Sequence, residues 1–370
     1  MEIIGIIGEY NPFHNGHIYH INKIKEKYPD SLIILVLNGY FLQRGEISIL
    51  TKEDKTNIAL NHNIDIVIEL PFVYGTQSAD IFANTAIRLL NELKVNRIIF
   101  GSESNDIEKL TLIANTQLND KNYDKNVKEY LDKGYNYPTV MAKALKINNF
   151  DFLPNDLLGI SYIKSILINR YDIQIETIQR TNDYKDIKSN NTIISASNIR
   201  EKLNNNKNIT KYLPNDSLNK IININNNKLF TLLKYKINTD KDLSIYLDVD
   251  EGIEYRLKKL INKSTNLDNF IYNIKTKRYT YNKINRMLIH ILIGLTKKDN
   301  KIVSLDYLKI IGFNNDGQKY LNSIKKDITL SLNPNNSLLN EYELKSSLIY
   351  DLINNTNTYS FELSNKPIKK

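Results

Sequence analysis

The 370-residue chain has no cysteine at all and only five histidines. The absence of cysteine excludes disulfide bonds and thiolate metal sites, and it fits a reducing cytosol. Nowhere does an apolar run approach the ~20 residues that a helix needs to cross a bilayer. The N-terminus has no basic segment followed by an apolar stretch, so we expect no signal peptide. These absences together predict a cytoplasmic protein that does not enter membranes.

Negative charge is scarce in the back half of the chain. Residues 1–200 contain 22 Lys and Arg against 24 Asp and Glu, a net charge of −2, whereas residues 201–370 contain 28 against 17, a net charge of +11. A near-neutral front half followed by a basic back half favours chemistry in front and a polyanion held behind. The alternative is a Lys-rich composition without nucleic-acid binding, and charge by itself does not separate the two.

Short β-branched runs alternate with helical segments through the front half. This alternation predicts an α/β fold with a doubly wound parallel sheet. We expect strands at 2–8, 31–38, 65–71, 97–103 and 171–180, and helices at 16–27, 52–62, 78–93, within 105–168 and from about 195. An Asn-rich stretch near 201–228 indicates a surface linker. We therefore expect one domain over 1–203 and a mainly helical basic domain over 204–370.

Four polar loops follow the first four expected strands. They read "EYNPFHNGH", "NGYFLQRGE", "PFVYGTQSAD" and "GSESND". In a doubly wound sheet, ligands bind beyond the carboxyl ends of the strands, near the point where the strand order reverses. All four loops should therefore face the same crevice.

Three of the five histidines, His14, His17 and His20, lie in the first of these loops and in the helix after it. A helix N-terminus offers free N–H groups and the positive end of a dipole, which together bind phosphate. Gly16 lets the backbone approach a ligand closely. His14 and His17 can add N–H donors on either side. The pattern favours a phosphate site.

A metal site and structural histidines are the two alternatives. No carboxylate lies one turn away on the same helix face, and the other two histidines, His62 and His290, are distant in sequence. We therefore expect no metal bound by the protein here. Three histidines at one strand–loop–helix junction are also more than a satisfied core or surface would need.

The sequence "HNGH" at 14–17 matches the H-x-G-H signature of the nucleotidyltransferase superfamily, which includes the class I aminoacyl-tRNA synthetases. In that superfamily the turn binds the phosphates of ATP and stabilises attack at the α-phosphorus. A second segment, "ISASNIR" at 194–200, resembles the I-S-S-T-x-I-R helix start of nucleotidylyltransferases. Ala196 and Ser197 depart from that pattern, and Ala196 lacks the hydroxyl of one family contact. The resemblance implies phosphate contacts from Ser195, Ser197 and Arg200.

A narrower resemblance covers nearly the whole chain. The segments "EYNPFHNGHIYH", "FLQRGE", "DIVIELPF", "TQSAD", "FGSE", "PNDLLGISYIK", "KTKRYT" and "INRMLIH" resemble the bacterial tRNA(Met) cytidine acetate ligases. The resemblance implies that acetate attacks ATP to give acetyl-adenylate and pyrophosphate. The acetyl group then passes to N4 of the wobble cytidine of elongator tRNA(Met). ATP is the implied co-substrate, and Mg²⁺ is expected with it.

The resemblance also implies an ATP site, in which His14 and His17 are catalytic. Its residues are Ile7, Gly8, Glu9, Tyr10, Asn11, Pro12, Phe13, His14, Asn15, Gly16, His17, Ile18, Tyr19, His20, Gly101, Asn155 and Arg180. A guanidinium at the end of the fifth strand would stabilise phosphate charge. Beside this site, Gln43 and Arg44 of "FLQRGE" are our candidates for the acetate end, because arginine pairs bidentately with a carboxylate.

The basic half contains a cluster of cations interleaved with tyrosines. Cations of this kind neutralise phosphates, while Tyr279 and Tyr281 would stack on unpaired bases. An exposed Lys-rich helix face without a ligand is the alternative. The candidate tRNA contacts are Lys275, Lys277, Arg278, Lys283 and Arg286.

Two other functions remain open from the sequence. A small-molecule nucleotidylyltransferase would share the first domain, but the long basic half counts against it. A non-catalytic RNA-binding protein would keep the fold, but the intact residues His14, Gly16, His17 and Arg200 count against it.

Overall fold

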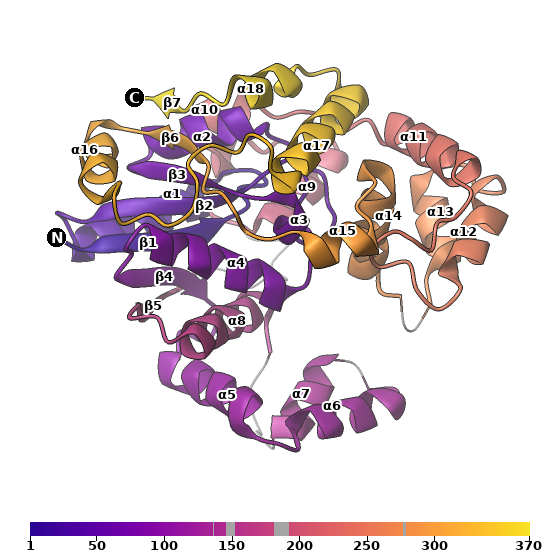
Figure 1. Ribbon diagram of the computed structural model, residues 1–370, viewed down its shortest axis with the longest axis horizontal. Helices are drawn as coiled ribbons and strands as arrows, with labels where there is room; N and C mark the ends of the chain where they lie inside the picture. The colour runs from indigo at the N-terminus through magenta and orange to yellow at the C-terminus, as the bar shows by residue number, and fades with distance from the viewer. Residues whose placement is uncertain (136, 146–151, 181–191, 277–278) are drawn as a thin grey trace.

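The computed structural model describes residues 1–135, 137–145, 152–180, 192–276 and 279–370. Its centre is a seven-stranded sheet in the order β5-β4-β1-β2-β3-β6-β7, in which the first five strands of the order are parallel to one another (Figure 1). This confirms the predicted α/β class with a doubly wound parallel sheet. The strands are β1 (Ile3–Gly8), β2 (Leu32–Asn38), β3 (Ile66–Leu70), β4 (Arg97–Ser102), β5 (Gln174–Gln179), β6 (Ile310–Phe313) and β7 (Ile368–Lys369).

Two strands of the sheet come from the back half of the chain and were not predicted. β6 pairs antiparallel with β3, and β7 pairs parallel with β6 at the sheet edge. Each is short, at four and two residues, so neither produces a recognisable apolar run. The sheet thus draws strands from both sides of residue 203, and the domain boundary at that residue stays a prediction.

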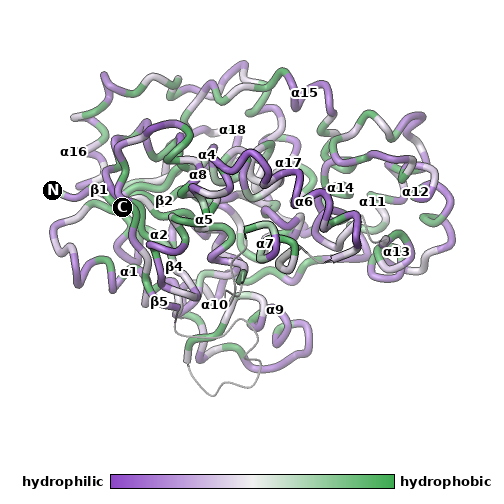
Figure 2. Tube along the Cα trace, turned by 90° about the horizontal axis from the view of Figure 1, so that it is seen from below, coloured by the Kyte–Doolittle hydropathy of each residue, from purple (hydrophilic) through white to green (hydrophobic). Residues whose placement is uncertain are grey.

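Alternate residues of the central strands face opposite sides of the sheet, as strand geometry requires. On one face, Ile4 and Leu35 pack with Ile21 and Ile24 of α1 and with α2. On the other face, Ile34 packs in a second cluster with α4, α8 and α17. Figure 2 shows the hydrophobic residues concentrated along these strands. Both faces are covered, so the strands read as continuous apolar runs.

Three sets of helices bear on the site. α1, α2, α4, α8 and α17 pack on the faces of the sheet, α5 to α7 extend beyond α8, and α11 to α14 gather at one end of the molecule (Figure 1). The first ten are α1 (Asn15–Lys27), α2 (Lys52–Asn61), α3 (Phe72–Gly75), α4 (Ala79–Glu92), α5 (Ile107–Asn119), α6 (Tyr123–Asp132), α7 (Tyr137–Leu145), α8 (Pro154–Asn169), α9 (Ala196–Asn204) and α10 (Asn215–Leu218). The others are α11 (Asn226–Thr239), α12 (Ile253–Ile261), α13 (Leu267–Ile274), α14 (Tyr281–Ile293), α15 (Lys297–Ile302), α16 (Asn315–Ile324), α17 (Leu338–Asn354) and α18 (Thr358–Ser364), with a 3₁₀ turn at Thr210–Tyr212.

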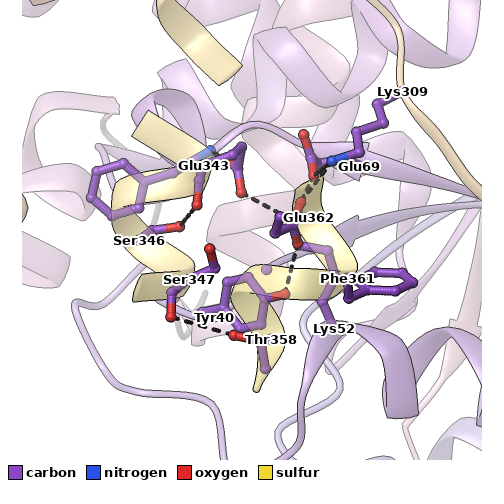
Figure 3. A network of polar contacts seen from close by, with 12 residues as sticks. Tyr40, Lys52, Glu69, Lys309, Glu343, Ser346, Ser347, Thr358, Phe361 and Glu362 are labelled. Carbon is purple, nitrogen blue, oxygen red and sulfur yellow. Dashed lines mark hydrogen bonds and ion pairs between the residues drawn. The ribbon is translucent and has the colours of Figure 1, made fainter. Parts of the chain in front are cut away.

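A buried ionic cluster fastens the C-terminal helices to the sheet (Figure 3). The ammonium of Lys52 on α2 lies 2.5 Å from Glu69 of β3, 2.9 Å from Glu343 of α17 and 2.8 Å from Glu362 of α18. Lys309 adds a second ammonium 2.6 Å from Glu362. Burial opposes the charge on Lys52, but the three carboxylates raise its pKa well above the ordinary value. Paired in this way, the buried charges tie together segments that are about 300 residues apart.

Candidate active site

The cleft lies where the strand order of the sheet reverses. β1 is flanked by β4 on one side and β2 on the other, so the chain leaves the sheet in opposite directions beyond its carboxyl end. A cavity of about 630 Å³ opens there, lined by the ends of β1 and β4, by the loops that follow β1 and β2, and by the starts of α8 and α9. This is the position and the size expected of a small-molecule site in a doubly wound sheet.

The histidine turn is held by two reciprocal hydrogen bonds at the start of α1. His14 is the N-cap residue, and its Nδ1 accepts from the backbone N–H of Gly16 at 2.9 Å. The Nδ1 of His17 accepts from the backbone N–H of His14 at 3.1 Å. The pair forms a capping box built from two histidines, in the geometry normally made by a serine and a glutamate. Both rings are thereby fixed against the helix N-terminus.

These bonds also decide which ring nitrogen of each histidine faces the ligand. Because each Nδ1 accepts a hydrogen bond, we assign the proton of each neutral ring to Nε2. Burial, together with the guanidinium groups of Arg180 and Arg200, lowers the pKa of His14 to about 3. Burial and the neighbouring His14 hold the pKa of His17 well below its ordinary value. At neutral pH the turn therefore presents two neutral N–H donors, which suit phosphate oxygens.

The backbone of the turn is constrained at two positions, Gly16 and Tyr10. A Cβ on Gly16 would lie 2.6 Å from Cε1 of His14, so only glycine leaves the capping ring in place. Tyr10 has φ of 48°, a left-handed conformation that is uncommon for a bulky residue. Its ring is held by Phe13 and His17, with centroids 4.9 and 4.5 Å away. Strain of this kind concentrates at functional sites.

A second helix N-terminus closes the cleft from the opposite side. Ser195 caps α9 by accepting from the N–H of Asn198 at 3.2 Å, and its hydroxyl lies 3.1 Å from that of Ser197. Arg200, one turn further on, donates to the backbone oxygen of Asn11 at 2.7 Å and pairs with Glu46 at 2.5 Å. The cleft thus lies between two helix N-termini, an arrangement that attracts a polyanion.

The ends of β4 and α8 are fastened by two carboxylates. Asp156 accepts from the N–H groups of Glu103 and Ser104, both at 3.1 Å. Glu103 in turn accepts from the backbone and the side chain of Asn155, and lies 3.9 Å from Nε of Arg180. This places Asn155 and Arg180 on the wall of the cleft beside Gly101.

A buried lysine joins the carboxyl ends of β1 and β2. The Lys55 ammonium donates to the backbone oxygens of Glu9 at 3.1 Å, of Asn38 at 2.6 Å and of Gly39 at 2.6 Å. Burial lowers the pKa of Lys55 to about 7. Three acceptors match the three N–H bonds of an ammonium, so the charged form holds both loop starts in register.

Comparison with known proteins gives a consistent result over the whole chain. The model of the HIGH nucleotidyltransferase family matches residues 1–366. The tRNA(Met) cytidine acetate ligase of Caldicellulosiruptor saccharolyticus is 37% identical over 376 residues, covering 95% of this chain and 94% of that protein. The enzyme of the same name from Fusobacterium nucleatum is 38% identical, covering 93% and 92%. The chain belongs to the tRNA(Met) cytidine acetate ligase family.

A solved member of the tRNA(Met) cytidine acetate ligase family has the same fold. The crystal structure of Thermotoga maritima TmcAL bound with alpha-thio ATP has a TM-score of 0.85 and 27% sequence identity, and covers 100% of this chain and 99% of that chain. The apo form of the same protein has a TM-score of 0.82 and 29% identity. In the described part of this chain, no helix is both long and apolar enough to cross a membrane.

Most of the predicted site residues of this tRNA(Met) cytidine acetate ligase family member lie together in the cleft. The predicted residues on its walls are Ile7, Gly8, Glu9, Tyr10, Asn11, His14, Gly16, His17, Tyr19, His20, Gln43, Arg44, Gly101, Asn155, Arg180, Ser195, Ser197 and Arg200. Four others lie behind it. Pro12 and Phe13 are buried, Ile18 packs against the core, and Asn15 donates to the backbone of Thr192 and Lys211.

Several cleft residues were not predicted as site residues. Phe82 and Tyr162 come from α4 and α8, and they form an apolar wall. Glu46 reaches the cleft from the loop after β2, and Asn282 reaches it from the first turn of α14. Phe82 and Asn282 lie in none of the motifs, whereas Glu46 lies in "FLQRGE" and Tyr162 lies in "PNDLLGISYIK". Tertiary packing brings these residues to the site from helices and a loop that are distant in sequence.

The predicted tRNA contacts lie around the start of α14. Lys275 is exposed, and its ammonium lies 5.1 Å from the ring of Tyr281. Lys283 lies 4.2 Å from the ring of Tyr279. Tyr279 is only 3% exposed and its hydroxyl bonds to the backbone of Asp250, so it cannot stack on a base as we expected. Arg286 lies 3.8 Å from Asp248. The other two predicted contacts, Lys277 and Arg278, lie outside the described residues.

Proposed function

We propose that this protein activates acetate with ATP and transfers the acetyl group to N4 of the wobble cytidine of elongator tRNA(Met). One observation carries the proposal. The histidine capping box lies at the switch point of the sheet in a chain that resembles tRNA(Met) cytidine acetate ligases from end to end. The bound alpha-thio ATP of the Thermotoga maritima protein supports the nucleotide part of the proposal.

In the first step, a carboxylate oxygen of acetate attacks the α-phosphorus of ATP and pyrophosphate leaves. Negative charge then builds on the phosphate oxygens between α1 and α9. The Nε2–H groups of His14 and His17 and the two helix N-termini would donate to them. Arg180 and Arg200 would supply positive charge from the opposite wall. The chemistry needs fixed donors, and the capping bonds fix them before the ligand arrives.

Acetate would bind beside the loop after β2. Gln43 and Arg44 line the cleft there, and Gln43 is anchored by donating from its side chain to the backbone oxygen of Gln77 at 2.8 Å. A guanidinium and an amide suit a small carboxylate. The apolar residues Phe82 and Tyr162 would face its methyl group.

Mg²⁺ is expected with the ATP phosphates, where it would neutralise the charge of the leaving pyrophosphate. The described residues on the cleft walls include two carboxylates, Glu9 and Glu46, and Glu46 is paired with Arg200. A single carboxylate without an ion-pair partner is too few to hold Mg²⁺ without the nucleotide. We therefore assign Mg²⁺ mainly to the ATP phosphates.

The acceptor tRNA would lie along the start of α14. Lys275 and Lys283 would neutralise phosphates, and the exposed Tyr281 would stack on an unpaired base. Asn282 on the same turn lines the cleft, so this surface continues into the site of activation. A base entering the cleft from this side would meet the activated acetate.

The test is pyrophosphate release from ATP with and without acetate, followed by nucleoside analysis of elongator tRNA(Met). We expect acetate-dependent release together with N4-acetylcytidine at the wobble position. Release that depends on a nucleotide or a phosphoester would indicate a small-molecule nucleotidylyltransferase. Binding of tRNA without any pyrophosphate release would indicate a non-catalytic RNA-binding protein.

A further inference from the structure

Among the described residues, two carboxylates lie on the walls of the cleft, Glu9 and Glu46, and they differ in what surrounds them. Glu46 forms an ion pair with Arg200 at 2.5 Å, which neutralises it. Glu9 forms no ion pair with any described residue. Its Oε1 accepts from the side chain of Asn38 at 3.2 Å and from the backbone N–H of Gln43 at 2.7 Å. In the described part of the chain, its Oε2 accepts no hydrogen bond and is the oxygen left for a ligand.

The position of Glu9 is fixed from both ends. Its backbone oxygen accepts from the buried Lys55 at 3.1 Å, and its Oε1 is held by the two donors of the loop after β2. A side chain anchored through one carboxylate oxygen presents the other at a defined point. This is the arrangement expected of a group that handles a proton, because proton transfer requires hydrogen-bond reach and a fixed geometry.

Glu9 also lies on the side of the cleft that faces the basic helices. Gln43, which it binds, belongs to the loop 41–47, and Gly45 of that loop packs against the backbone of Asn285 and Arg286 in α14. A base that enters past Asn282 therefore reaches the wall formed by Glu9 and this loop.

The chemistry of the second step calls for a base at this wall. The lone pair of cytidine N4 is weakly nucleophilic because it is delocalised into the ring. When N4 bonds to the acetyl carbon, the nitrogen becomes positively charged and strongly acidic, so a carboxylate is a sufficient acceptor for its proton. His14 and His17 are poor candidates, since their Nδ1 atoms already accept hydrogen bonds and their Nε2 atoms carry protons.

We propose that Glu9 is the general base of acetyl transfer, an inference that rests on the proposed function. N4 of the cytidine attacks the carbonyl carbon of acetyl-adenylate, and a new N–C bond forms. The C–O bond to the phosphate of AMP breaks, and AMP leaves with that electron pair. The proton of N4 passes to Oε2 of Glu9 and then to solvent. Glu9 thus acts in the second step, whereas the histidine turn acts in the first.

The test is Glu9→Gln, with the two steps measured separately. Glutamine keeps an oxygen at the position of Oε1, so the bonds from Asn38 and Gln43 can persist, but it cannot take a proton. Acetate-dependent ATP–pyrophosphate exchange reports the first step. Single-turnover transfer from preformed enzyme-bound acetyl-adenylate to elongator tRNA(Met) reports the second. We expect transfer to slow by roughly 10²–10⁴-fold, the usual contribution of a general base, and exchange to fall by no more than about tenfold.

Two further variants complete the design. Glu9→Asp keeps a carboxylate and should transfer faster than Glu9→Gln, which a merely structural role would not produce. Glu46→Gln releases Arg200 and should impair exchange more than transfer, the reverse of Glu9→Gln. Equal loss of both steps in Glu9→Gln, or unimpaired transfer, would overturn the assignment of Glu9 while leaving the proposed function intact. Absence of acetate-dependent exchange in the unmodified protein would instead overturn the proposed function, and this inference with it.

Discussion

The rings of His14 and His17 use one nitrogen for the fold and leave the other for a ligand. Each Nδ1 satisfies a backbone N–H at the start of α1, and each Nε2 is free to donate. The H-x-G-H pattern is therefore a structural requirement as well as a chemical one. Gly16 serves both requirements, because any side chain at this position would displace the ring of His14.

Two substitutions at His17 separate these uses. Asparagine places an oxygen near the position of Nδ1 and lacks Nε2, whereas alanine removes both. We expect His17→Asn and His17→Ala alike to abolish acetate-dependent pyrophosphate exchange and to leave tRNA binding intact. Only His17→Ala should also lower the free energy of unfolding, by about 1 kcal/mol, the usual value of a lost helix cap. Urea unfolding and exchange assays measure the two effects. Normal exchange in His17→Asn would exclude Nε2 from the reaction.

For single residues, the sequence predicted the members of the H-x-G-H motif better than it predicted which side chains are buried. The motif could be recognised because the preceding strand, the three residues His14, Gly16 and His17, and the start of the following helix all lie within about twenty residues of sequence. The base stacking assigned to Tyr279 was wrong, because its alternation with lysines hides the fact that its hydroxyl anchors the backbone of Asp250. Burial depends on elements that no local pattern shows.

Among the elements, the loop 41–47 is the link between the cleft and the basic helices. Gly45 has φ of 73°, and a Cβ there would lie 2.3 Å from the backbone nitrogen of Arg286. Backbone atoms of a helix cannot move aside as a flexible side chain can. The loop therefore keeps its contact with α14 only with glycine at this position.

Gly45→Ala should separate the loop from α14. We expect a loss of roughly 2 kcal/mol in the free energy of unfolding, from overpacking and the positive φ together. Acetyl transfer should fall more than exchange, because the wall that receives the base is displaced. The matched control is Gly294→Ala at the other end of α14. Gly294 has φ of 85° with nothing within 4 Å of its Cβ position, so it reports the backbone strain alone. Equal effects of the two variants on transfer would show that the contact is unimportant.

The helices α17 and α18 each contribute one carboxylate to the buried cluster, and the two differ in protonation. Burial and the neighbouring Glu69 raise the pKa of Glu343. Burial acts in the same direction on Glu362, but the ammonium groups of Lys52 and Lys309 outweigh it and lower the pKa. Glu362 is therefore the carboxylate that the cluster keeps ionised.

Glutamine substitutions test this difference. Glu362→Gln removes a paired buried charge and should cost about 3–5 kcal/mol in the free energy of unfolding, whereas Glu343→Gln should cost less.

The two variants should also differ in their pH dependence. The raised pKa of Glu343 means that the folded state holds a proton that the unfolded state has released. The contribution of protonated Glu343 to the free energy of unfolding is present at low pH and is lost as the pH rises through its raised pKa. The stability gap between the unmodified protein and Glu343→Gln should thus shrink from pH 5.5 to pH 8 in urea unfolding, and the gap for Glu362→Gln should not. The opposite ranking would reverse the assignment.

The main elements of the sheet were predictable, and its edge was not. Four of the five parallel strands are apolar runs bounded by loops, β5 alternates polar and apolar residues, and all five were expected. β6 and β7 are too short to show a period. β6 pairs with β3, which lies more than 240 residues earlier, and β7 pairs with β6. The sequence pattern places four charged residues at the surface, but they are buried because they pair with one another. These are Lys52, Glu69, Glu343 and Glu362.

Across the whole molecule, the excess positive charge and the cleft occupy different regions that meet at one edge. The helices α11 to α14 gather at one end, and α16 lies at the opposite end (Figure 1). The start of α14 is the part of this region that reaches the cleft. The positive region therefore adjoins the site rather than surrounding it.

Charge reversal at Lys275 and Lys283 should weaken tRNA binding and spare the first step. We expect Lys275→Glu with Lys283→Glu to lower the slope of log affinity against log salt by about 1–2, since each lost phosphate contact removes about one unit. Acetate-dependent exchange should stay within twofold. Lys319→Glu on α16 is the control, because this exposed lysine pairs with Asp316 far from the cleft. Equal salt slopes in all three proteins would place the RNA surface elsewhere.

The buried cluster also constrains the order in which the protein can be completed during its synthesis. Glu343 and Glu362 follow Lys52 by about 300 residues, so they leave the ribosome long after it. Until then, Glu69 is the one carboxylate of the cluster that Lys52 can pair with, and the sheet edge that β6 and β7 cover is still open. The sheet that carries the cleft can therefore reach its final rigidity only after Glu362 has been made.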